Sequence, residues 1–193
     1  MNVGVTDMTL DPTHLRSLAL SGQAFDPVSL LRELTKQDES QLRALWRTRP
    51  FKELRELTDA CLFAYGLTLL FGSPVTVLHG EIEDYDFVLR RVGSDGVTEV
   101  MGVQLKEFPP ENLNRAFTLQ DLLTRLSAYT LTDATLLIRL NRTGYIPDDL
   151  LSSVQLPFAE VWYLWATSPD GLGWCIYGDV MQQPRRYEFA YPL

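Results

Sequence analysis

The sequence predicts an α/β domain in which a long helix precedes an antiparallel meander of three strands, a second helix and a further strand. Three observations support this class. Apolar residues recur at spacings of three and four over residues 51–71, which is the period of an amphipathic helix. Residues 84–107 alternate between polar and apolar side chains on either side of a GSDG turn, as in a hairpin. Residues 134–142 form a mainly apolar run, which is typical of a strand covered on both faces.

The N-terminal part is expected to be helical over residues 10–49. Asp26 followed by Pro27 matches an N-cap with proline at the first helical position. Nothing in this part suggests chemistry. We expect a helical extension over residues 1–49 that forms an accessory layer or a lid.

The core elements follow in order over residues 50–145, and an aromatic β extension over 146–193 is expected to pack on the same domain. The expected helices are 51–71 and 118–129, the second with Thr118 as a candidate cap. The expected strands are 74–80, 84–92, 97–107, 134–142, 161–166 and 174–180. The last two would form a C-terminal β-hairpin.

Charge and cysteine content exclude several classes of function. The chain carries 25 Asp and Glu against 17 Lys and Arg, a net charge of -8, which argues against a protein that coats nucleic acid by charge alone. Contact with DNA would have to be made in a local cleft or through a metal ion. Cys61 and Cys175 are too few for a disulfide framework or a cysteine zinc site.

The sequence also predicts the compartment. The first residues include acids where a signal peptide would carry positive charge, so we expect a cytoplasmic protein. The uncharged stretch 60–80 is interrupted by glycines and a proline. We therefore expect it to be a buried helix leading into a buried strand, and we expect no membrane partner.

The hairpin at 84–107 carries the candidate chemistry, and two registers compete for it. In the first, Asp86 lies opposite Gln104 and Arg91 lies opposite Glu99, an opposite-charge cross-strand pair. Sliding the strands by one residue would bury Gln104 in the apolar core, which the cost of burying polar groups disfavours. We therefore predict the first register.

In that register the two faces of the hairpin differ. The apolar face would hold Tyr85, Phe87, Leu89, Met101, Val103 and Leu105. The polar face would hold Asp84, Asp86, Arg90, Gly102, Gln104 and Lys106. Carboxylate and amide oxygens suit Mg²⁺ or Mn²⁺, and a lysine beside such a metal can orient an attacking water or stabilise charge on a phosphate. The alternative interpretation is that this face is ordinary solvated surface.

At these residues the chain resembles the PD-(D/E)XK nuclease superfamily, whose core is a helix, three strands, a helix and a further strand. The resemblance covers roughly residues 50–142, with Asp86 in DYDFVL and with Gln104 and Lys106 in VQLKE as the matching residues. The superfamily usually has Asp or Glu where this chain has Gln104, and the Gln-x-Lys form is similar to that of the Mrr-type restriction endonucleases. The resemblance implies a restriction-endonuclease-like core in which Asp86 and Gln104 bind the metal and Lys106 positions the nucleophilic water.

Two further ligands are candidates. Many members of the superfamily place a glutamate of the first helix at the metal, and Glu53 and Glu56 are the choices here. Glu56 is preferred because it lies nearer the strands, although both could be solvent-exposed helix acids. Asp84 shares the predicted face of Asp86 and could be a second carboxylate ligand or a solvated loop acid.

The predicted function is therefore hydrolysis of DNA phosphodiester bonds by an endonuclease-like protein that uses Mg²⁺ or Mn²⁺. The second hypothesis is a catalytically inactive nuclease-fold module that acts by protein–protein binding, in which Gln104 marks the loss of a strong ligand. The aromatic C-terminal segment would then be the interface with a protein partner or with a second copy of the chain.

Overall fold

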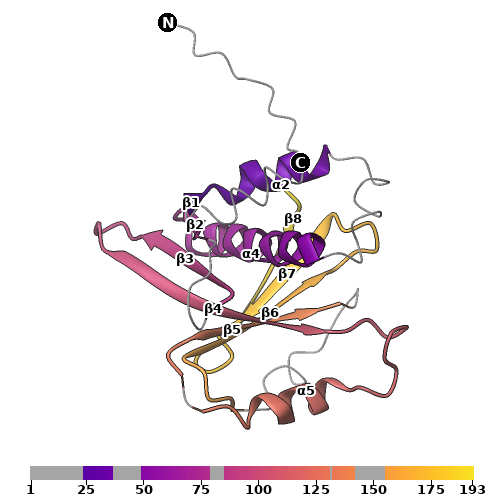
Figure 1. The fold of residues 1–193 in the computed structure, drawn as a ribbon. Helices are drawn as coiled ribbons and strands as arrows, with labels where there is room; N and C mark the ends of the chain where they lie inside the picture. The colour runs from indigo at the N-terminus through magenta and orange to yellow at the C-terminus, as the bar shows by residue number, and fades with distance from the viewer. Residues whose placement is uncertain (1–23, 37–48, 79–84, 131, 142–154) are drawn as a thin grey trace, which may run out of the picture.

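The computed structural model describes residues 24–36, 49–78, 85–130, 132–141 and 155–193. The strands of these residues form one mixed sheet of eight strands, which lie side by side in their order along the chain, β1 to β8. Helices α2 and α4 cover one face of this sheet and helix α5 lies on the other (Figure 1). The predicted mixed α/β class is confirmed.

The helices are α2 (Pro27–Thr35), α4 (Arg49–Phe71) and α5 (Leu119–Leu126). The strands are β1 (Ala24–Phe25), β2 (Val75–Leu78), β3 (Phe87–Val92), β4 (Thr98–Phe108), β5 (Thr135–Leu140), β6 (Glu160–Ala166), β7 (Gly173–Gly178) and β8 (Arg185–Ala190). From α4 to β5 the order is the predicted one: a helix, three antiparallel strands, a helix and a further strand. No helix among the described residues is long and apolar enough to cross a membrane.

The relative direction of neighbouring strands differs between the centre of the sheet and its two sides. Strands β4, β5 and β6 run parallel, whereas the other neighbouring pairs are antiparallel. Helix α5 lies in the connection from β4 to β5, because parallel neighbours need a crossover that a short turn cannot supply. Strand β5 is buried at every position except Arg139, in agreement with the central place predicted from its apolar run.

Alternation along the strands divides the interior into two cores. Leu137 of β5 packs with α4 in the first core, while its neighbours Leu136 and Ile138 pack with α5 in the second. Strand β4 is paired in register with β5, so Val103 and Leu105 belong to the α4 face and Gln104 and Lys106 to the α5 face. The sheet therefore separates two surfaces that can carry different functions.

The helix starts follow the expected capping chemistry. The side chain of Asp26 accepts a hydrogen bond from the Ser29 amide at 2.9 Å, and Pro27 occupies the first turn of α2. Thr118 and Asp121 form a reciprocal capping box at the start of α5. Helix α5 ends at Leu126, three residues earlier than predicted, and α4 begins at Arg49.

The expected C-terminal β-hairpin is present as β6 and β7, which pair antiparallel, and the structure extends it on both sides. Strand β6 continues the central parallel part of the sheet, and β8, which was not predicted, adds an edge strand. Tyr163 and Trp165 of β6 are almost completely buried in the second core. Strand β8 has the sequence RRYEFA, which contains no apolar run and therefore did not predict a strand. An edge strand exposes much of its length and needs no such run.

Candidate functional site

The register of the hairpin is the one predicted. Phe87 pairs with Val103 and Leu89 with Met101, which sets the alignment from the start of β3 to the turn. At the other end the side chains of Arg91 and Glu99 form the expected cross-strand ion pair, with Nη2 at 2.5 Å from the carboxylate. This pairing brings the backbone at Asp86 alongside the Gln104 to Lys106 stretch of β4.

Asp86 lies in a bend just before β3 begins at Phe87, and its backbone runs beside β4. Its amide donates to the carbonyl of Val103 at 2.9 Å. Its Oδ2 atom accepts a hydrogen bond from the Leu105 amide at 2.6 Å. The carboxylate is therefore held level with Leu105, between Gln104 and Lys106 along the strand. It accepts from the Leu105 amide, a backbone donor that makes no hydrogen bond to β3.

Gln104 and Lys106 lie on the same face of the sheet, as predicted. They pair with Leu136 and Ile138 of β5, whose side chains pack in the core beneath α5. Lys106 is partly exposed, and the Oε1 atom of Gln104 is buried. Oε1 therefore reaches a metal beside Asp86 only if the amide turns outward.

Tyr85 does not share the face of Phe87, so that part of the predicted apolar face is wrong. A β-carbon added at Gly102 would meet the Tyr85 ring at 2.5 Å, so the ring lies directly on that glycine. The hydroxyl group of Tyr85 donates to Asp133 at 3.1 Å, and the ring packs against the core beneath α5. The bend of the backbone at Asp86 interrupts the alternation and turns Tyr85 to the other face.

The structure describes the place of one further candidate ligand, Glu56, which lies away from Asp86. Glu56 lies on α4, whose neighbouring Leu57 packs in the core on the opposite face of the sheet from Gln104. Its carboxylate pairs with Lys52 at 3.3 Å. Asp84 and the side chain of Glu53 lie outside what the structure describes. Among the described residues no group of three or more His, Cys, Asp or Glu side chains could hold a metal ion.

A second polar cluster, on the α4 face, was missed by sequence reasoning. Arg139 of β5 donates from Nε to Oδ1 of Asp59 on α4 at 3.0 Å, and both side chains are mostly buried. The guanidinium also donates to the Leu164 carbonyl and lies 4.5 Å from the centre of the Trp174 ring. An arginine inside an otherwise apolar strand was the signal, since a buried cation needs a carboxylate partner.

This pair lines a cleft of about 430 Å³, whose other walls come from α2, the turn between β6 and β7, and Tyr191. Burial raises the pKa of Asp59 to about 6, although the nearby guanidinium of Arg139 lowers it; Glu107 raises it further and Arg55 lowers it. Glu107 itself is held by Arg55 and by the Asn141 amide. The cluster ties α4 to the ends of β4 and β5.

Comparisons with known proteins add no relative: no family model, curated protein or solved structure matches the chain.

Proposed function

We propose that the protein is a metal-dependent nuclease of restriction-endonuclease-like fold that hydrolyses DNA phosphodiester bonds. The observation that carries the proposal is the placement of the Asp86 carboxylate level with Leu105, between Gln104 and Lys106 along β4. The order of elements from α4 to β5, with a helix on each face of the sheet, supports it (Figure 1).

The donor set suits a hard cation. Asp86 contributes a carboxylate with one oxygen not used by the Leu105 amide, and Gln104 contributes an amide oxygen after the rotation described above. Bound Mg²⁺ or Mn²⁺ would polarise the phosphate and lower the pKa of a coordinated water. Asp84 remains the proposed further ligand. Lys106 would orient the attacking water and stabilise negative charge on the phosphate.

Cleavage of linear, supercoiled and single-stranded DNA with Mg²⁺ or Mn²⁺ tests the proposal. Asp86→Asn keeps an acceptor for the Leu105 amide but removes the charge, and Lys106→Ala removes the ammonium. Each is expected to lower the rate at least about 100-fold, the usual cost of losing one group that stabilises charge in the transition state. Lys36→Ala changes an exposed lysine at the C-cap of α2 that pairs with Glu33; it is the matched control and should cut normally.

The same experiment separates the second candidate, an inactive nuclease-fold module that binds a protein partner. The buried Oε1 atom of Gln104 favours this candidate, because a buried amide oxygen makes a poor ligand for a hydrated metal. A folded native protein that cuts none of the substrates with either metal would contradict the nuclease. Equal cutting by native protein, Asp86→Asn and Lys106→Ala would contradict the assigned site.

A further inference from the structure

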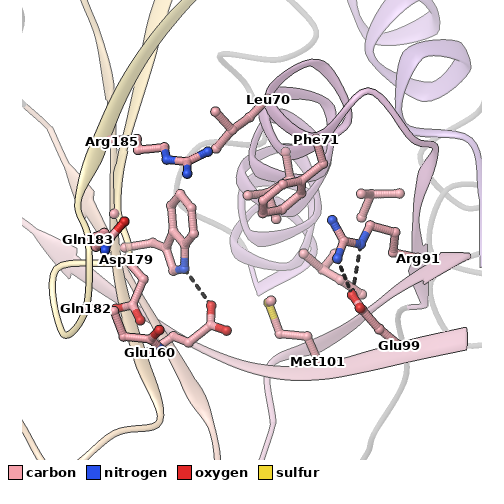
Figure 2. Close-up of a pocket in the computed structure, with 15 residues that line it drawn as sticks. Leu70, Phe71, Arg91, Glu99, Met101, Glu160, Asp179, Gln182, Gln183 and Arg185 are labelled. Atoms are coloured by element: carbon pink, nitrogen blue, oxygen red, sulfur yellow. Dashed lines mark hydrogen bonds and ion pairs between the residues drawn. The ribbon is translucent and has the colours of Figure 1, made fainter. Parts of the chain in front are cut away.

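A second pocket lies on the α4 face of the sheet, away from the face of Gln104 and Lys106. Its volume is about 560 Å³, and it opens between the C-terminal end of α4, the β3–β4 hairpin and the strands β6 to β8 (Figure 2). This volume suits a small organic ligand such as a nucleotide. What the pocket could bind follows from the groups that line it.

Glu160, at the start of β6, supplies a carboxylate without a cation. Its Oε2 atom accepts a hydrogen bond from the indole Nε1 of Trp162 at 2.8 Å, which orients the group. Partial burial raises the pKa of Glu160, and the charges of Asp179 and Glu99 raise it further, while the Trp162 hydrogen bond and the more distant charge of Arg91 lower it. Among the described residues Glu160 makes no ion pair. A carboxylate accepts hydrogen bonds and donates none, so a ligand should meet it with N–H groups.

Arg185, at the start of β8, supplies a cation without an anion. Its side chain is exposed and has no ion pair with any residue that the structure describes. The other arginine of the pocket differs, because Arg91 donates twice to Glu99 and lies 4.3 Å from the centre of the Phe71 ring. Figure 2 shows Arg185 and Glu160 at opposite ends of one wall. A ligand along that wall can carry an anionic group at one end and N–H donors at the other.

The remaining lining suits a flat body. Phe71 and Met101 face this wall across the pocket (Figure 2), and the Phe71 side chain is 42% exposed. Apolar and aromatic side chains of this kind pack against the faces of aromatic rings. Gln182 and Gln183 add two exposed amides at the rim, which can both donate and accept.

We propose that this pocket binds a guanine nucleotide, with the N1–H and the 2-amino group donating to the Glu160 carboxylate and the phosphate paired with Arg185. Guanine presents two adjacent donors on one edge, which match the two oxygens of a carboxylate. Adenine and cytosine place an acceptor beside the amino group, and uracil places an acceptor on each side of its single donor. An acidic pocket end therefore selects guanine among the four bases.

Titration calorimetry of the full chain with GMP, IMP, guanosine and AMP tests the proposal, and each ligand isolates one contact. IMP lacks the 2-amino group and should bind about 10-fold more weakly than GMP, and AMP more weakly still. Glu160→Gln should weaken GMP by about 10-fold to 100-fold and abolish the preference for GMP over IMP. Arg185→Ala should weaken GMP by about 10-fold and leave guanosine unchanged.

Matched controls come from the exposed loop after β4. Glu111→Gln and Arg115→Ala are the same kinds of substitution, made at exposed residues that do not line the pocket. Both variants should bind GMP as the native protein does. Absence of GMP binding at about 1 mM, equal affinity for AMP and GMP, or unchanged GMP binding by Glu160→Gln would each overturn the proposal. The readout is binding without cleavage, so the outcome is independent of the nuclease proposal.

Discussion

The buried pair of Asp59 and Arg139 makes the stability of the protein depend on pH in a direction opposite to that of most ion-paired carboxylates. The pKa of Asp59 is raised from 3.8 to about 6, chiefly by burial. The folded protein therefore binds a proton at Asp59 more tightly than the unfolded chain does. The contribution of Asp59 to stability is therefore fully present below about pH 4, where both states are protonated, and is lost as the pH rises through about 6.

The size of this effect follows from the two pKa values. Each pH unit between them is worth 1.36 kcal/mol, so ionisation of Asp59 removes about 3 kcal/mol of stability in all, of which about 2 kcal/mol is lost between pH 4 and pH 7. Solvent screening changes this little, because the side chains of Asp59 and Arg139 are only 15% and 12% exposed. Asp59→Asn replaces the carboxyl with a neutral group of the same shape, which still accepts from Arg139.

Urea unfolding of the native protein and of Asp59→Asn from pH 4 to pH 8 measures the prediction. Groups remote from Asp59 titrate equally in both proteins, so the difference between the two free energies of unfolding reports on Asp59 and its charged neighbours. That difference should move by about 2 kcal/mol in favour of the variant as the pH rises from 4 to 7. Asp95→Asn, an exposed carboxylate in the β3–β4 turn, should show no such change.

Two results would refute the reasoning. A stability difference that stays constant across this pH range would mean that burial does not raise the pKa of Asp59. A change of the opposite sign would mean that Arg139 holds the carboxylate ionised more strongly than burial disfavours it. In that case the ion pair with Arg139 would stabilise the ionised form of Asp59.

Three further predictions concern stability and are measured by urea unfolding. Thr118→Ala removes the reciprocal cap of α5 and should cost about 1 kcal/mol, while a loss below about 0.3 kcal/mol would argue against the capping box. Leu123→Ala opens a cavity beneath α5 and should cost about 3 kcal/mol; a cost near zero would mean that α5 is not packed on the sheet. Gly178→Ala places a β-carbon 2.6 Å from the Trp162 ring and should cost about 2 kcal/mol, and full stability would show that the indole can shift freely.

The elements from α4 to β5 could be predicted because their signals are local. The spacing of apolar residues along α4, the turn between β3 and β4 and the unbroken run of β5 all depend on near neighbours in the chain. The hairpin register could also be predicted, because one alignment pairs Arg91 with Glu99 and keeps Gln104 out of the core. These inferences needed no knowledge of distant residues.

The features that the sequence did not predict correctly depend on contacts between distant parts of the chain. Tyr85 changes face because the backbone bends at Asp86, whose carboxylate takes the Leu105 amide 19 positions away. Glu56 was chosen for its proximity to the strands in sequence, but α4 covers the other face of the sheet. Strand β8 has no strong pattern of its own and is recognised by its pairing with β7.

The sequence by itself determined the class of fold, the order of the elements from α4 to β5 and the polar residues that come together in the hairpin. It determined these because secondary structure and strand register follow from the periodicity of apolar side chains. Only the tertiary structure decided that Asp59 meets Arg139 across 80 positions, and that Glu160 and Arg185 face one pocket. Burial and electrostatic partnership depend on which elements pack together, and that packing sets both the pKa of Asp59 and the chemistry that the pocket can recognise.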